Sequence, residues 1–170
     1  AGLSLNIFNK HCDRVKMANI AQLINVLQAV ILTDGPRMLR TPTYHVFHMY
    51  KYHQDADLVE SYLDGVETIG EEEEYMVPSL QESVSIDKEG ILTITLNNLS
   101  VDKDEPVEIS FAECQTKEVT AAILNNEMHA YNTFEDPDKV HEEVFSNYTV
   151  ENGMIRFTMP ASSVVQFRVR

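Results

Sequence analysis

The sequence predicts a mainly β protein, an antiparallel β-sandwich, preceded by a helical or α/β part that ends near Asp55. Short segments of alternating apolar and polar residues follow one another from Leu58 onward. Turn sequences such as Asp87–Gly90 and the Asn152-Gly153 pair separate them. The longest apolar-rich run, residues 17–53, precedes them all. Short strands at this spacing are typical of antiparallel sandwiches.

The first part begins with the predicted end of an amphipathic helix over Gly2–His11, with Leu3, Ile7 and Phe8 on its apolar side. From Val15 onward two interpretations stay open. Apolar residues recur at helical spacing through residue 31, but residues 15–22 also fit a short buried strand, because buried parallel strands are almost continuously apolar. Residues 33–36, Thr-Asp-Gly-Pro, predict a turn.

A second helix is predicted from Pro42 to Tyr52. Thr41 can cap it with its hydroxyl, and Pro42 occupies the first helical position, where a missing N–H costs nothing. Its apolar face contains Tyr44 and Phe47, together with Tyr50 or His48.

The predicted strands end in a hairpin and a closing strand. Residues 92–96 predict a half-buried strand, with Thr93 and Thr95 on the solvent side. An Asn-Gly turn at Asn152-Gly153 predicts a hairpin. The strands of this hairpin are predicted at residues 145–150 and 154–159. An extended pattern is predicted to begin at residues 59–63, and further strands at residues 84–86, 107–111, 119–124 and 164–169.

The composition excludes some classes of partner. The formal net charge of −14 repels nucleic acid and anionic lipid, so neither is expected as a partner. The charge is compatible with a neutral ligand such as a sugar, and equally with an acidic surface that only keeps the protein soluble. The run Glu71–Glu74 is expected to be a solvated loop. The sequons at Asn98 and Asn147 match the glycosylation pattern only.

No cofactor and no metal site are predicted. Cys12 and Cys114 lie far apart without a CxxC pattern and are expected to be free thiols. His45 and His48 lack further ligands, so helical packing is expected for them. The adjacent residues 11–13, His-Cys-Asp, are not interpreted as a nucleophile triad, and His129 and His141 lie in no motif.

Two blocks resemble the α-L-arabinofuranosidases of glycoside hydrolase family 51. The first joins DRVKMANIAQLINVLQA, residues 13–29, with TPTYHVFHMY, residues 41–50. The second is HAYNTFEDPDKV, residues 129–140, followed by MPASSVVQFRV, residues 159–169. The resemblance implies that residues 1–55 are the last helix–strand–helix piece of a (β/α)8 barrel, and that residues 56–170 are a jelly-roll-type β-sandwich. It also leads us to expect the second helix to pack on the sandwich.

Family members are retaining glycosidases that use two glutamates. The resemblance implies that both precede Ala1, so no catalytic residue is expected in this chain, and the chain alone is expected to be inactive. One substrate residue carries over: Gln22, in the AQLxN block, is expected to hydrogen-bond arabinose in the intact enzyme. Asn25 is expected to be a structural loop residue.

The expected function is therefore that of the C-terminal portion of an α-L-arabinofuranosidase, acting on arabinose-containing plant polysaccharides and oligosaccharides. The alternative is a non-catalytic carbohydrate-binding or structural β-sandwich module. A homo-oligomer is expected. The resemblance favours a cytoplasmic location, whereas the periplasm and secretion stay open because the resemblance implies a missing N-terminal part.

Overall fold

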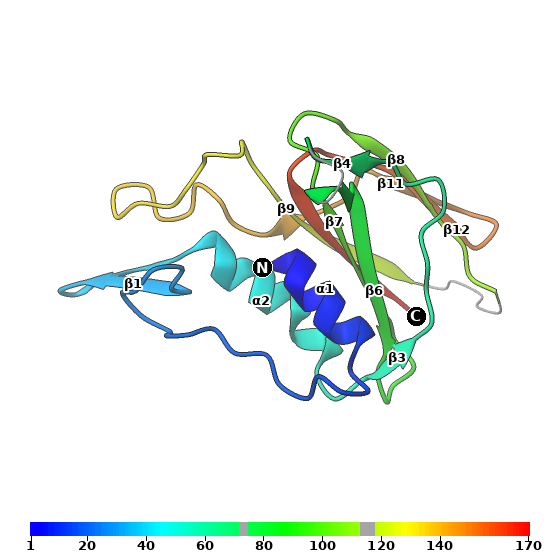
Figure 1. The fold of residues 1–170 in the computed structure, drawn as a ribbon, viewed down its shortest axis with the longest axis horizontal. Helices are drawn as coiled ribbons and strands as arrows, with labels where there is room; N and C mark the ends of the chain where they lie inside the picture. Colours follow the sequence, from blue (N-terminus) through cyan, green and yellow to red (C-terminus); the bar gives the residue numbers. More distant parts are fainter. Residues whose placement is uncertain (72–74, 113–117) are drawn as a thin grey trace.

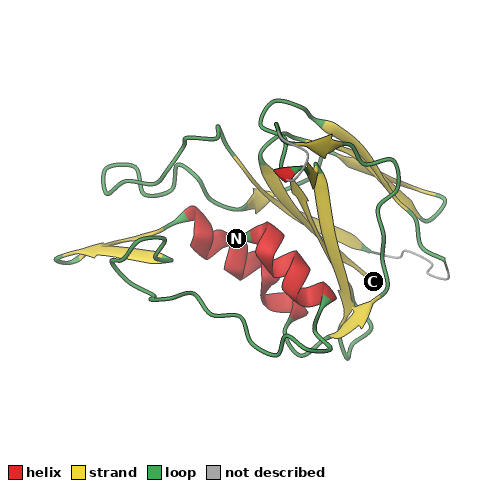
Figure 2. Ribbon diagram, in the orientation of Figure 1, coloured by secondary structure: helices red, strands yellow, loops and turns green. Residues whose placement is uncertain are grey.

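The computed structural model describes residues 1–71, 75–112 and 118–170. Three layers lie on one another: two helices, a six-stranded sheet and a three-stranded sheet (Figures 1 and 2). All paired strands in the two larger sheets are antiparallel, so the predicted mainly β, antiparallel sandwich is confirmed.

The six-stranded sheet is built around the last strand of the chain. Its order is β10-β9-β13-β7-β6-β3. Strand β13 pairs over its whole length with β7 on one side and β9 on the other. The strands are β3 (Asp57–Val59), β6 (Leu80–Ile86), β7 (Leu92–Asn98), β9 (Val119–Asn125), β10 (Glu143–Val144) and β13 (Ser163–Val169).

The three-stranded sheet has the order β11-β12-β8. It contains β8 (Glu105–Ile109), β11 (Tyr148–Glu151) and β12 (Met154–Met159). Asn152 and Gly153 join β11 to β12 with φ values of 53° and 78°, as the predicted hairpin requires. A separate pair, β4 (Thr68–Ile69) and β5 (Val77–Pro78), lies beside these sheets.

The main core lies between the two larger sheets. Phe167 on β13 is fully buried, and its ring contacts the rings of Phe145, Tyr148 and Phe157 at centroid distances of 4.9–6.2 Å. The other buried side chains of this core are Leu80, Ile94, Leu96, Val107, Ile155, Met159, Val165 and Val169. These alternate positions are the ones that the strand pattern predicts to face inward.

The other face of the six-stranded sheet is covered by helices α1 (Gly2–Lys10) and α2 (Pro42–Tyr50) (Figure 2). The expectation that the second helix packs on the sandwich is therefore confirmed. The prediction of a half-buried strand is wrong: Thr93 and Thr95 are 1% and 0% exposed, because the helices cover the side that was predicted to face solvent.

Helix α2 begins at Pro42, but it is not capped as predicted. Thr41 occupies the N-cap position without a side-chain capping bond, and its hydroxyl donates to the carbonyl of Ala29 instead, at 2.8 Å. The helix ends at Tyr50 and is followed by a 3-10 turn, η1 (Lys51–His53). Its buried residues are His45, Val46, Met49 and Tyr50, so of the predicted apolar face only Tyr50 is buried.

Helix α1 also turns an unexpected side to the sheet. Its buried residues are Gly2 and Asn6, whereas the predicted apolar residues Ile7 and Phe8 are 43% and 39% exposed. A Cβ at Gly2 would lie 2.1 Å from Oδ1 of Asn97, so glycine allows the start of α1 to approach β7 closely.

Between the helices, neither interpretation of the segment after Val15 is correct, because residues 15–22 form no helix and no strand. A buried parallel strand needs a hydrogen-bonded neighbour on each side, and the described residues supply none for this segment. The chain instead enters the hairpin of β1 (Ile31–Asp34) and β2 (Arg37–Arg40), turning at Gly35 and Pro36 as predicted.

Candidate functional site

Gln22 lies in an exposed segment that is anchored just after it. The N–H of Ile31 donates to the carbonyl of Leu23 at 3.2 Å, and Ile24 forms a parallel bridge with Ile31. The backbone directly after Gln22 is therefore held beside the start of β1, and Gln22 itself is exposed.

Asn25 fixes this segment to the hairpin. Its Oδ1 accepts the N–H of Thr33 at 2.7 Å, and its Nδ2 donates to Thr33 Oγ1 at 2.8 Å. The backbone of Asn25 has a φ of 56°, a conformation that asparagine tolerates better than most residues. Asn25 is thus a structural loop residue, as expected.

The loop between β9 and β10 lies against the same hairpin (Figure 1). Asn132, which is 7% exposed, donates to the carbonyls of Arg40 and Val140 and accepts the N–H of Val140. One amide side chain of the second block thereby binds Arg40, which is 92 residues away along the chain and directly precedes residues 41–50 of the first block.

Two arginines of β2 add charge contacts to this junction. Arg40 lies 3.4 Å from Asp138 and 5.6 Å above the ring of Tyr44. Arg37 pairs with Asp34, lies 3.5 Å from Glu135 and stacks 4.7 Å from the ring of Phe134. The hydrogen bond that Arg37 donates to Asp34 raises the pKa of Arg37 and keeps it cationic.

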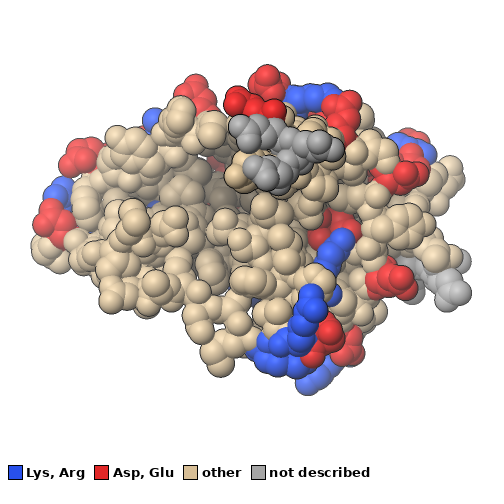
Figure 3. Space-filling view, in the orientation of Figure 1, with Lys and Arg blue, Asp and Glu red and all other residues tan. Residues whose placement is uncertain are grey.

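The surface around Gln22 is unusually apolar. Met17, Leu23, Ile24 and Leu27 are 75%, 55%, 46% and 92% exposed. Figure 3 shows almost no charged side chains over this lower left part of the molecule. Exposed large apolar side chains that gather in one segment are typical of regions that contact another part of a protein or a partner.

The two histidines of α2 have different surroundings. His45 is 2% exposed and desolvation lowers its pKa, whereas His48 lies 2.6 Å from Glu142 and 2.7 Å from Lys51 Nζ. Helical packing is thus the observed role of His45. The described residues contain no group of three or more His, Cys, Asp or Glu side chains that could hold a metal ion.

The remaining candidates of the sequence analysis show no combined site. Cys12 is a free, exposed thiol in the turn after α1, beside His11, whose ring contacts Arg14 at 3.3 Å. His141 contacts the carbonyl of Asp138 and lies 3.4 Å from Glu143. Cys114 and Glu72–Glu74 lie outside the described residues, and Glu71 is exposed.

Sequence reasoning missed a buried polar network between the helices and the six-stranded sheet. Asn6 Oδ1 accepts hydrogen bonds from the hydroxyls of Tyr50, Ser83 and Thr95 at 2.8–2.9 Å. Asn97 Nδ2 donates to Tyr50 Oη at 2.9 Å, and burial raises the pKa of Tyr50. The only signal was the row of serine, threonine and asparagine at alternate positions of two strands, which an exposed sheet face would share.

His53 extends this network at the edge of the helix layer. Its ring contacts Ser85 Oγ at 2.7 Å and Thr95 Oγ1 at 3.0 Å, and desolvation lowers its pKa to about 4. A neutral imidazole presents one donor and one acceptor, which two hydroxyls can satisfy. The network therefore contains a neutral histidine at pH 7, with a positioning and structural role.

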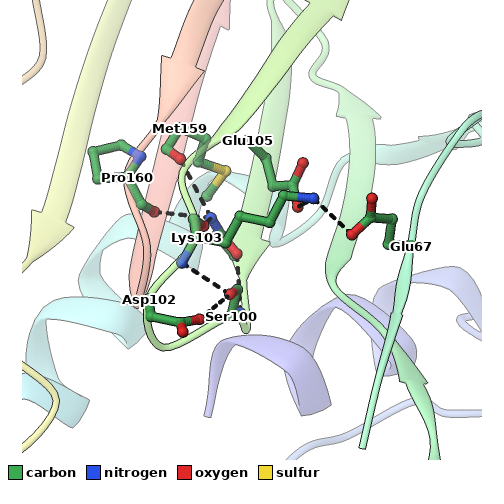
Figure 4. Close-up of polar contacts among 8 residues, drawn as sticks. Glu67, Ser100, Asp102, Lys103, Glu105, Met159 and Pro160 are labelled. Atoms are coloured by element: carbon green, nitrogen blue, oxygen red, sulfur yellow. Dashed lines mark hydrogen bonds and ion pairs between the residues drawn. The ribbon is translucent and has the colours of Figure 1, made fainter.

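A second polar cluster surrounds Lys103 (Figure 4). Lys103 Nζ lies 2.6 Å from Glu67 and 3.3 Å from Glu105, and these hydrogen bonds raise its pKa. Asn98 Nδ2 donates to the carbonyls of Lys103, Met159 and Pro160. The cluster ties together the connections at one end of the sandwich, and a cationic lysine cannot act there as a nucleophile. Asn98 is 2% exposed, so its sequon is buried.

No helix in the described part of the chain is long and apolar enough to cross a membrane.

The chain is similar over its whole length to known proteins. It is 37% identical over 171 residues to an intracellular exo-α-L-arabinofuranosidase of Bacteroides ovatus, matching 100% of this chain and 33% of that protein. The crystal structure of the family 51 arabinofuranosidase of Xanthomonas axonopodis pv. citri matches with a TM-score of 0.90 and 36% identity, over 97% of this chain and 33% of that one.

The α-L-arabinofuranosidase of Thermotoga maritima, solved as an arabinose complex, matches with a TM-score of 0.81 and 26% identity, over 99% of this chain and 37% of that chain. The chain thus spans about a third of the length of these relatives. The model of the α-L-arabinofuranosidase C-terminal domain matches residues 1–163, and the chain belongs to that family.

Proposed function

We propose that this chain is the C-terminal portion of a retaining α-L-arabinofuranosidase, which releases terminal non-reducing α-L-arabinofuranosyl residues from arabinose-containing plant polysaccharides and oligosaccharides. The end-to-end similarity to proteins three times as long carries this proposal. Both catalytic glutamates belong to the preceding part of the longer protein, and residues 1–55 belong to its (β/α)8 barrel, with the boundary to the sandwich at residue 55.

The exposed apolar side chains around Gln22 support this arrangement. Fully burying a side chain such as Leu27 yields about 1.5–3 kcal/mol, so an isolated surface of four such residues is expected to be covered in the complete enzyme. Barrel strands preceding this chain are suited to cover it, and they would also give residues 15–22 the hydrogen-bonded neighbours that the segment lacks here.

Gln22 is the substrate contact in this proposal. Its side-chain amide offers a donor and an acceptor to adjacent sugar hydroxyls. The bridge at Ile24 and the Asn25–Thr33 hydrogen bonds hold the backbone next to it, and groups of such barrels that bind substrate lie at the ends of strands. We also propose a cytoplasmic location and a homo-oligomer for the complete enzyme.

An activity assay tests the proposal. The 170-residue chain alone is expected to show no turnover of an aryl α-L-arabinofuranoside, whereas the longer protein that contains it is expected to be active. In the longer protein, Gln22→Ala should lower kcat/KM about 5- to 150-fold, the loss of roughly 1–3 kcal/mol of hydrogen bonding in the transition state. Its thermal unfolding midpoint should not change.

Gln54→Ala is the matched control, because Gln54 is an exposed amide outside this segment. Wild-type kcat/KM in the Gln22→Ala enzyme would overturn the role of Gln22. Turnover by the purified 170-residue chain itself would overturn the placement of the catalytic glutamates.

A further inference from the structure

A groove lies on the outer face of the three-stranded sheet. This sheet is the layer farthest from the helices (Figure 1). Its volume is about 510 Å³, and it is open to solvent. Val107 and Phe157 lie on the strands that form the floor of the groove, and they are 8% and 7% exposed because their side chains point into the core. Successive side chains of a strand point to opposite faces, so the groove lies on the side of the sheet opposite the core.

The pairing of the strands places polar side chains in one row across this groove. Arg156 on β12 lies directly opposite Glu108 on β8 and Thr149 on β11. Neighbouring strands are about 4.8 Å apart, so the row spans about 10 Å, more than one sugar ring. Two further polar residues line the groove next to this row: Asn147, which directly precedes β11, and Thr158 on β12.

These side chains offer both donors and acceptors. Asn147, Thr149 and Thr158 are exposed, and their side chains show no hydrogen-bond partner among the described residues. Arg156 Nε donates to Glu108 Oε2 at 2.6 Å, which fixes the guanidinium and carboxylate relative to each other. The sheet register therefore fixes the positions of Glu108, Arg156 and Thr149 in the row before any ligand binds.

The charge of the groove selects against anions. Arg156 lies between Glu108 and Glu151, at 2.6 Å and 3.8 Å, so its positive charge is already balanced. A phosphate or carboxylate ligand would meet two carboxylates and one guanidinium, in a chain with a net charge of −14. A neutral ligand rich in hydroxyl groups matches the set, since each hydroxyl both donates and accepts.

We propose that this groove is a second carbohydrate-binding site, which holds a neutral oligosaccharide on the sandwich and away from Gln22. Arg156 and Glu108 bind adjacent hydroxyls of one sugar unit, and Asn147 and Thr149 bind those of the next. In the complete enzyme the site keeps the polysaccharide chain near the protein between cleavage events. The choice of arabinose-containing oligosaccharides as ligand rests on the proposed function, whereas the hydroxyl chemistry does not.

Titration calorimetry and amide chemical-shift mapping on the 170-residue chain test the proposal, with arabinopentaose as probe and cellopentaose and ATP as comparison ligands. We expect millimolar binding of arabinopentaose, shifts at residues 106–108, 147–149 and 156–158, and no binding of ATP. Asn147→Ala and Arg156→Ala should each weaken binding at least fivefold, while Gln54→Ala should not. Cellopentaose binding in the same groove would also support the site, but would point to a ligand other than that of the proposed function.

Three results would overturn the proposal. The first is that neither oligosaccharide binds detectably at 10 mM or so. The second is binding that Gln22→Ala removes and Asn147→Ala leaves unchanged. The third is binding of ATP in the groove. Arg156→Ala removes an exposed ion pair and is expected to keep the fold, and Asn147→Ala tests the site independently because that side chain has no described partner. If the chain binds arabinopentaose in the groove but the longer protein shows no arabinofuranosidase activity, the binding site would stand while the proposed function fails.

Discussion

The two faces of the six-stranded sheet are both buried, but they are built from different chemistry. The inner face places Ile94, Leu96 and Phe167 against the three-stranded sheet. The outer face places Ser83, Thr95 and Asn97 beneath the helices, together with Gln166, which donates to the carbonyl of Met49. The inner face is stabilised by the burial of apolar area, which needs no direction. The outer face combines directional hydrogen bonds with a smaller apolar cluster around Val46, Met49 and Leu124.

The largest effect is expected on the inner face. Phe167→Ala should lower the free energy of unfolding by about 3–5 kcal/mol, because it leaves a cavity at the contact of three aromatic rings. Denaturant unfolding measures it, with Phe8→Ala, 39% exposed, as the control that should change stability little. Equal losses for the two variants would mean that Phe167 does not lie at the centre of the core.

On the outer face, Asn6→Ala should lower the free energy of unfolding by about 2–3 kcal/mol. Three hydroxyls would lose their shared acceptor, and each buried group left without a partner costs roughly 1–3 kcal/mol, partly offset by re-pairing among them. Asn19→Ala, at an exposed amide, is the control and should be neutral. A loss below 0.5 kcal/mol or so would show that the network adds little to stability.

The smallest expected effect is a dependence on pH that only the outer face should show. The pKa of His53 is about 4 in the folded chain and 6.5 when unperturbed, so the unfolded state binds the proton first as the pH falls. Stability from the neutral ring is complete above pH 6.5 and should decline by about 1–3 kcal/mol toward pH 4, less than the full shift implies because the ring is partly exposed.

Unfolding midpoints of the wild type and of His53→Gln, measured from pH 7.5 to pH 4, test this prediction. The difference between the two proteins should change across that range, since glutamine keeps the hydrogen bonds but does not titrate. A difference that stays constant with pH would contradict the neutral, buried histidine.

The comparison also explains what the sequence could predict. Strands β7 and β13 and the Asn152-Gly153 hairpin were predictable, because alternation and turn chemistry are local properties of the chain. Alternation shows which side chains share a face but not what covers that face, so Thr93 and Thr95 were wrongly predicted to face solvent.

The N-terminal part was predicted less well for the same reason. Residues 15–22 carry the apolar pattern of a buried strand or helix. Such a segment is buried only when other segments of the protein pack against it, and its own pattern does not say which these are. Thr41 was predicted as a cap from its position, but nearby carbonyls compete for its hydroxyl. At the candidate site, Asn25 was predicted correctly, and the role of Gln22 stays a prediction. The groove at Arg156 arises from cross-strand register, which no local pattern reveals.

The central place of β13 has a consequence for the order in which the fold can form. Strands β7 and β9 are not paired with each other but with β13, which is made after both. During synthesis β7 and β9 therefore each keep one unpaired edge until residues 163–169 have left the ribosome. Exposed strand edges favour association between chains. A truncation before Ser163 would remove β13 and leave the sheet in two halves. A bulky fusion close after Val169 would hinder the pairing of β13 with β7 and β9.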